Sequence, residues 1–260
     1  MKRWLRRAAF ARGYTLARRV TEAEVRDLVQ TLRPRCCAAP LIRLGSPGDG
    51  GYLIPDDLEG IEYCFSPGVS RNSDFENALA DRNIRSFMAD YSVAQLPLLR
   101  PEFVFDRKFI GARNNDIFMT LGAWKDRYLP DYAGELLLQM DIEGAEYEVI
   151  LNAPSELLAS FRIIVLELHA LDRLFDPFAH RIMRTCFEKL LAEFHVVHAH
   201  PNNCGGVTVY DGIEVPLVVE ITLYNRRRGA AGAYRQDLPH ALDADNCPGR
   251  APMRLPDWWR

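Results

Sequence analysis

The chain has 260 residues with a formal net charge of -3 at pH 7, and it is 48% hydrophobic and 26% charged. This composition is that of a globular protein and excludes a disordered or fibrous chain. A slightly acidic chain is not built mainly to neutralise nucleic-acid phosphates, so we expect no nucleic-acid partner. No apolar run reaches the roughly 20 residues that a membrane-spanning helix needs, so we expect no transmembrane segment.

The first 20 residues are rich in arginine, with aromatic residues such as Trp4 and Phe10 between them. They lack the continuous apolar stretch of a secretory signal, so we expect a cytoplasmic protein. The favoured interpretation is a capping or frayed helix, and the alternative is a basic amphipathic helix that contacts an anionic membrane. None of the six cysteines forms a C-x-x-C pair, which predicts reduced, incidental thiols.

The chain divides into three predicted parts: a helical extension over 1–42, one domain over 43–226, and an irregular C-terminal strap over 227–260. Thr21 precedes Glu22 and Glu24, which predicts a capped helix running through Leu32. A segment dense in turn residues follows from Arg43.

From Ile61 onward, short apolar runs alternate with helical stretches, which is typical of a parallel α/β sheet. The last two runs are too close for a helix between them, so we expect an antiparallel hairpin there. The sequence therefore predicts a Rossmann-like, mostly parallel seven-stranded sheet with helices on both faces, the layout of class I methyltransferases. The predicted strands are 61–65, 84–89, 103–109, 136–140, 163–168, 195–200 and 215–224, and the predicted helices between them are 74–82, 144–151 and 177–193.

In such a sheet the ligand lies beyond the carboxyl ends of the strands. Gly68 follows the first predicted strand and would let the backbone approach a cofactor closely. Asp90, followed by Tyr91, ends the second strand 22 residues later (90 − 68). A carboxylate about 20 positions after the glycine can accept the hydroxyls of a ribose. The alternatives are an ordinary turn at Gly68 and a helix cap at Asp90.

The most specific segment is Asp141-Ile-Glu143-Gly-Ala-Glu146-Tyr-Glu148, which directly follows a strand. It resembles the hallmark of FkbM-type methyltransferases, and the segments Asp49–Tyr52, Met119–Trp124 and Glu167–His169 agree with it. The resemblance implies S-adenosylmethionine as cofactor and a hydroxyl of a sugar, glycan or secondary metabolite as acceptor. The residues expected at the cofactor are Asp49, Gly50, Gly51, Tyr52, Ser66, Pro67, Gly68, Val69, Asp90, Tyr91, Asp141 and Glu143.

Methyl transfer to a hydroxyl needs a general base or a divalent metal that acidifies the alcohol. His169 is the predicted base, with Glu167 as its orienting partner or as a ligand, since residues two apart on a strand share a face. The resemblance implies that Asp141 lies near the sulfonium or the acceptor hydroxyl. A metal site would use Asp141, Glu167 and His200. The alternatives are a structural histidine, and carboxylates at 141 and 143 that cap a helix starting at Gly144.

Two other functions fit a Rossmann-like sheet: an NAD-dependent enzyme and a non-catalytic cofactor-binding module. A full glycine-rich fingerprint would favour the NAD-dependent enzyme, but Gly68 is the only glycine of that fingerprint present in this chain. A membrane-associated scaffold is a further hypothesis, which depends on the N-terminal arginines alone.

Overall fold

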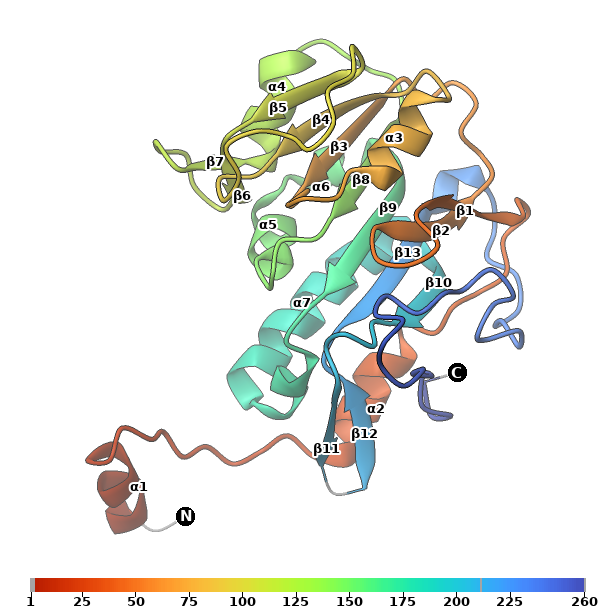
Figure 1. Ribbon diagram of the computed structural model, residues 1–260. Helices are drawn as coiled ribbons and strands as arrows, with labels where there is room; N and C mark the ends of the chain where they lie inside the picture. The colour runs from red at the N-terminus through yellow and green to blue at the C-terminus, as the bar shows by residue number, and fades with distance from the viewer. Residues whose placement is uncertain (1–2, 211, 260) are drawn as a thin grey trace.

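The computed structural model describes residues 3–210 and 212–259. Its centre is a seven-stranded sheet in the order β10-β13-β9-β8-β3-β4-β5, in which only β13 runs opposite to the others (Figure 1). This arrangement confirms the predicted fold class. The strands are β3 (Tyr63–Pro67), β4 (Arg85–Ala89), β5 (Phe103–Asp106), β8 (Leu136–Met140), β9 (Phe161–Leu168), β10 (Phe194–Pro201) and β13 (Val219–Asn225).

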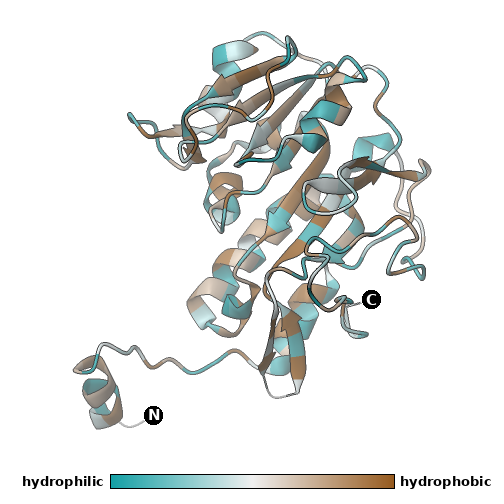
Figure 2. Cartoon of the chain, in the orientation of Figure 1, coloured by the Kyte–Doolittle hydropathy of each residue, from teal (hydrophilic) through white to brown (hydrophobic). Residues whose placement is uncertain are grey.

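The central strands are buried on both faces because their side chains alternate between two hydrophobic cores. On β8, Leu136, Leu138 and Met140 enter the larger core, whereas Leu137 enters the smaller one. Figure 2 shows the apolar residues gathered on these strands. The larger core is covered by α2 (Glu22–Gln30), α4 (Leu121–Tyr128), α5 (Glu146–Asn152), α6 (Ser155–Ala159) and α7 (Pro177–Glu193), and the smaller by α3 (Asp74–Ala80) with the hairpin of β1 (Leu41–Gly45) and β2 (Gly51–Pro55).

Local sequence explains where two of the helices begin. Thr21 and Glu24 form a reciprocal capping box at the start of α2. At α7, the Asp176 side chain accepts hydrogen bonds from the backbone N–H groups of Phe178 and Ala179, both at 2.9 Å, and Pro177 supplies the first helical residue. The helix predicted over 177–193 is therefore confirmed at both ends.

The strand order reverses between β3 and β8. The chain runs from β3 outward to β4 and β5, then returns to β8 and continues outward to β9 on the other side. Gly68, with φ +91°, follows β3, and a Cβ atom there would collide with the backbone carbonyl oxygen of Asp141 after β8. The loops after β3 and β8 thus meet at the point where ligands bind in such sheets.

Two predicted strands are each split in the structure. The prediction over 103–109 becomes β5 and the separate β6 (Phe109–Gly111), which pairs with β7 (Phe118–Thr120). The prediction over 215–224 becomes β12 (Ile213–Pro216), paired with β11 (Val207–Tyr210), and β13 in the main sheet. Pro216 has no N–H to continue a ladder, so the strand is interrupted there. β10 and β13 form the expected antiparallel pair at one edge of the sheet, with β10 outermost and β13 between it and β9.

The two ends of the chain differ in how they meet the body. Helix α1 (Arg3–Phe10) stands apart in Figure 1, whereas α2 packs into the larger core. After the short helix η2 (Arg226–Arg228), the C-terminal segment is irregular and buries Leu238, Leu255 and Trp259. Among the described residues, the structure contains no helix with the length and apolar character needed to cross a bilayer.

Cys204 and Cys247 form a disulfide, with their Cα atoms 5.4 Å apart. The prediction that all six cysteines are reduced is wrong for this pair, whose separation of 43 residues carries no local signal. The side chain of Asn203 reinforces the link through hydrogen bonds to the backbone of Cys247 at 3.0 and 2.8 Å. A cytoplasmic location stays a prediction, which the disulfide does not favour because such bonds are rare in reducing compartments.

Candidate functional site

A cavity of about 450 Å³ opens where the strand order reverses. One wall includes Gly68, Asp90, Asp141 and Glu143, four of the residues predicted at the cofactor. The other wall is apolar and was not predicted, because its residues come from β6 and β7, which the sequence pattern merged with a neighbouring strand or missed. It includes Phe109, Ile110 and Phe118.

Asp90 fixes two loops at the edge of this cavity. Its Oδ2 accepts a hydrogen bond from the Ser70 N–H at 2.9 Å, and its Oδ1 accepts from the Ser92 N–H at 2.8 Å and the Ser92 hydroxyl at 2.7 Å. No helix begins at Ser70 or Ser92, so Asp90 ties two loops together and does not act as the helix cap named as an alternative. Each carboxylate oxygen has two acceptor positions, so capacity for a ligand hydroxyl remains on Oδ2. Tyr91 is not part of the cavity wall; its ring lies 5.5 Å from that of Phe109.

A smaller cavity of about 60 Å³ lies beside the first and is bordered by Asp49, Gly50, Tyr52 and Val69. Gly51 and Pro67 instead lie in β2 and β3 and do not line either cavity.

A buried polar network supports the smaller cavity. The Ser66 hydroxyl lies 2.7 Å from Gln139 Oε1 and also contacts Glu76, while the Gln139 amide donates to the Tyr52 hydroxyl at 3.2 Å. Burial raises the pKa of Glu76 to about 7, although its bond with Ser66 opposes the shift. Ser66 and Tyr52 are thus held by a network that the sequence did not reveal, since Glu76 and Gln139 lie on separate elements.

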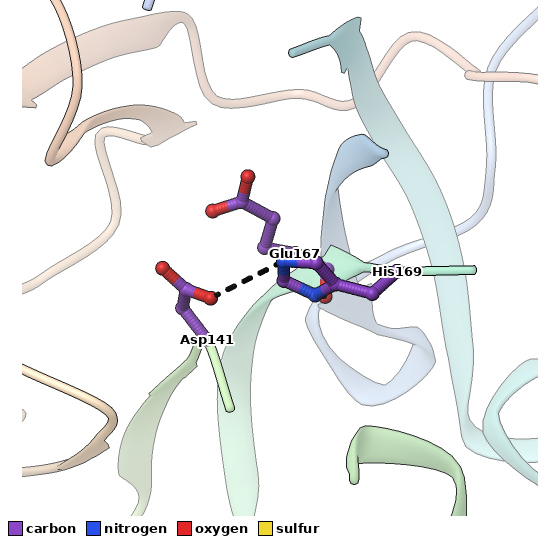
Figure 3. Close-up of side chains that lie close together, drawn as sticks. All are labelled: Asp141, Glu167 and His169. Atoms are coloured by element: carbon purple, nitrogen blue, oxygen red, sulfur yellow. Dashed lines mark hydrogen bonds and ion pairs between the residues drawn. The ribbon is translucent and has the colours of Figure 1, made fainter. Parts of the chain in front are cut away.

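Asp141, Glu167 and His169 come together at the ends of β8 and β9 (Figure 3). One ligand atom from each lies within 4.8 Å of the others. The arrangement follows from the sheet: β8 and β9 are parallel neighbours, so residues after Met140 and near Leu168 meet at one edge. A further buried carboxylate, Glu220 on β13, stands opposite Glu167 in the strand register.

These carboxylates are costly to bury in their charged form. Burial raises the pKa of Asp141 to about 9, and the charge of Glu167 adds to the shift. Burial likewise raises the pKa of Glu167 to about 8, with a contribution from Glu220, whose own pKa burial raises to about 7. The cluster therefore favours a bound cation, which would allow the carboxylates to ionise.

The ligand-free protein should lose stability as the pH rises from 5 to 9. The folded-state pKa values of Asp141 and Glu167 lie above the ordinary value of about 4, so the folded state holds more protons than the unfolded state in this window. Each such group adds up to about 1.4 kcal/mol per pH unit to the decrease in the free energy of unfolding. Urea denaturation at several pH values measures this slope. Glu167→Gln should flatten it, and an unchanged slope would contradict the assignment.

His169 is oriented with one ring nitrogen toward its support and the other toward the cluster. Nδ1 lies 3.1 Å from Glu146 Oε1 and 3.1 Å from the Glu167 carbonyl oxygen, whereas Nε2 lies 3.7 Å from Asp141 Oδ1. Burial lowers the pKa of His169, but the hydrogen bond and charge of Glu146 outweigh it, so the net shift is upward. When Nδ1 carries the proton, Nε2 is free to accept one on the side of the cluster.

Glu146 is the site residue that the sequence reasoning missed. It is fully buried, and its Oε1 also accepts hydrogen bonds from the N–H groups of Ile142 at 2.9 Å and Gly144 at 3.2 Å. The helix expected from Gly144 begins at Glu146. Glu146, and not Glu143, therefore accepts the backbone hydrogen bonds of the turn that precedes this helix. Glu143 has φ +57° and its side chain is 88% exposed. The sequence did hold a signal for Glu146, since it belongs to the same motif, Asp141–Glu148, as the predicted residues.

The supporting partner predicted for His169 also differs. Glu167 offers His169 only its backbone carbonyl, and its side chain instead accepts a hydrogen bond from Asn202. His200 lies outside the cluster, on the edge strand β10, with Nδ1 3.5 Å from Asp243 Oδ2. The structure thus does not bring His200 to Asp141 and Glu167, and the histidine that lies with them is His169.

Comparison with known proteins finds one family match within the sheet. Residues 129–204 match the model of the methyltransferase FkbM domain, a stretch that includes Asp141, Glu146, Glu167 and His169. A comparison with curated proteins finds no match. A chain in the crystal structure of a fibrillarin/Nop5p complex is 15% identical, with 65% of this chain and 74% of that chain covered and a TM-score of 0.38.

The matched residues span β8, β9 and β10 of the seven-stranded sheet and are similar to the methyltransferase FkbM domain. The resemblance to the FkbM family, expected from the segment Asp141–Glu148, is confirmed over the matched residues.

Proposed function

We propose that this protein is an S-adenosylmethionine-dependent O-methyltransferase that acts on a hydroxyl of a sugar, a glycan or a secondary metabolite. The observation that carries the proposal is the cavity between Gly68, Asp90 and Asp141, which borders the cluster containing His169. A cofactor cavity and a candidate proton acceptor thus meet at one residue, Asp141. The choice of a sugar or glycan comes from the family resemblance.

The residues of the cavity fit the proposed cofactor. S-adenosylmethionine supplies an electrophilic methyl group bound to a positively charged sulfur. Asp90 would accept hydrogen bonds from the ribose hydroxyls, and Phe109 and Phe118 would offer apolar surface to the adenine ring. The buried carboxylates of Asp141 and Glu167 favour positive charge nearby, and Asp141 Oδ1 is buried without a hydrogen-bond partner. A positively charged ligand would satisfy that oxygen.

His169 would take the proton from the acceptor hydroxyl as the oxygen attacks. Its Nδ1 is held by Glu146, so the ring presents Nε2 to the cluster in a fixed orientation. A carboxylate behind the imidazole also stabilises the protonated ring, as in the histidine–carboxylate pairs of hydrolases. Asp141, 3.7 Å from Nε2, adds a second favourable charge when it is ionised.

A divalent metal is the second route by which the site would activate a hydroxyl. Asp141, Glu167 and His169 offer two carboxylates and an imidazole, a donor set that Mg²⁺ or Mn²⁺ accepts through oxygen and that Mn²⁺ also accepts through nitrogen. A metal bound there would acidify the alcohol, and His169 would then act as a ligand.

The metal route predicts that the protein binds Mn²⁺ and that the double variant Asp141→Asn/Glu167→Gln does not. Electron paramagnetic resonance of Mn²⁺ mixed with the protein measures free metal directly, without an acceptor. Glu62→Gln/Glu102→Gln, two carboxylates outside the cluster, is the control. Equal Mn²⁺ binding by the cluster and control variants would rule out this metal site and leave His169 as the base.

Transfer itself is tested with trideuteromethyl-labelled S-adenosylmethionine and a panel of methyl glycosides, phenols and aliphatic alcohols. The proposal expects S-adenosylhomocysteine together with an acceptor that has gained one labelled methyl group, detected by mass spectrometry. Label found on a ring carbon of a phenol instead of on oxygen would overturn the O-methyltransferase assignment.

A further inference from the structure

The N-terminal arm, defined as residues 3–20, is strongly basic and partly apolar. It contains six arginines and no acidic residue. Within α1, successive side chains are about 100° apart around the axis, which places Trp4, Leu5, Ala8 and Ala9 on one face and the arginines on the other. None of the α1 side chains is buried, and Trp4 is 62% exposed.

The arm joins the body at one defined place. The Val20 N–H donates to the Phe175 carbonyl oxygen at 3.0 Å, and the Arg19 guanidinium lies 4.0 Å from the centre of the Tyr210 ring. The rings of Phe175 and Tyr210 stack with their centres 4.7 Å apart. The arm therefore leaves the body between β11 and the start of α7, and Figure 1 shows α1 beyond that point.

Large apolar side chains are exposed around this exit. Phe178 in the first turn of α7 is 68% exposed, and Val209 on β11 is 62% exposed. Phe178 and Ile182 also line an open groove between α5 and α7 that extends to Ala145, a residue that borders the 450 Å³ cavity as well. The arm, the exposed apolar residues and a groove leading to the site therefore share one region of the molecule.

We propose that the arm, together with Phe178 and Val209, docks on an anionic lipid bilayer. Six arginines complement anionic headgroups, and the aromatic and aliphatic side chains fit the boundary between headgroups and acyl chains. The groove would then open beside the membrane surface. If the proposed function holds, this placement favours an amphiphilic acceptor, whose apolar part lies along Phe178 and Ile182 while its hydroxyl approaches His169.

Flotation of the full chain with vesicles tests the docking directly. The protein should float with vesicles of phosphatidylglycerol and phosphatidylcholine and remain at the bottom with phosphatidylcholine alone. Flotation should be lost in high salt, because screening shortens the reach of surface charge to about 3 Å at 1 M. Arg3→Gln/Arg6→Gln/Arg7→Gln should weaken partitioning on the order of 100-fold.

Two further variants distinguish docking through the arm from nonspecific attraction of the protein's positive charges to the vesicles. Trp4→Ser/Leu5→Ser removes the two large side chains of the apolar face, keeps every arginine and should also reduce flotation. Arg71→Gln/Arg82→Gln/Arg85→Gln removes three exposed arginines near α3 and should float like the unchanged protein. Absence of flotation with the anionic vesicles, or an equal loss in the α3 control, would overturn the proposal. Flotation requires neither cofactor nor methyl transfer, so its failure is distinguishable from failure of the proposed function.

Discussion

His169→Asn should reduce methyl transfer by roughly 10²–10⁴-fold and leave S-adenosylhomocysteine binding nearly unchanged, because a general base contributes that much to the rate but does not hold the cofactor. The asparagine keeps a polar side chain of similar size in a site where His169 is only 15% exposed. Transfer rates and calorimetric binding constants measured on the same preparation separate the two effects.

His195→Asn is the matched control, since His195 lies at the start of β10 and outside the cluster. It should retain full transfer. If His169→Asn also keeps transfer within a few-fold of the unchanged protein, the proton must leave by another route.

Glu146→Gln tests how His169 is held, because Glu146 raises the pKa of that imidazole. Loss of the charge should lower the pKa, so the acid limb of the pH–rate profile should move to lower pH. A purely structural role for Glu146 would reduce activity without this displacement.

Gly68→Ala should both destabilise the fold and abolish cofactor binding. The added Cβ would strike the Asp141 carbonyl oxygen, and φ +91° is itself strained for alanine. Since one strained residue costs 1–3 kcal/mol before any collision, we expect a loss of about 3 kcal/mol or more in the free energy of unfolding. Urea denaturation and calorimetry with S-adenosylhomocysteine measure the two effects.

Gly206→Ala provides the comparison for Gly68→Ala. Gly206 has a similar φ of +85°, but a Cβ there would meet nothing within 4 Å. It should therefore cost only roughly 1–2 kcal/mol and leave cofactor binding intact. Equal losses of folding stability and cofactor binding in the two variants would show that the close approach of Gly68 to Asp141 is not needed for either.

The parts of the fold that the sequence predicted are those whose signals are local. β8 matches its predicted bounds because Leu136–Met140 is apolar at every position except Gln139 and is followed directly by a carboxylate, Asp141. α7 matches because Asp176 and Pro177 mark its start and an apolar periodicity continues to Glu193. Asp90, Asp141 and His169 could be proposed for the site because each follows a strand in a sheet of this type.

What the sequence did not predict depends on contacts between distant segments. The partners of Ser66 lie on α3 and β8, and Glu220 approaches Glu167 only because β13 inserts between β9 and β10. The Cys204–Cys247 disulfide likewise depends on the path of the C-terminal strap. Such pairs leave no periodic pattern, whereas Glu146 could have been found from its place in the motif beside Glu143.

The measurement that tests the central claim most directly is calorimetric titration of the purified protein with S-adenosylhomocysteine, with NAD titrated in parallel. The account predicts saturable micromolar binding of S-adenosylhomocysteine and no binding of NAD. Binding of NAD alone would replace the methyltransferase with an NAD-dependent enzyme. Binding of neither would contradict the assignment of the cavity between Gly68, Asp90 and Asp141 as a cofactor site.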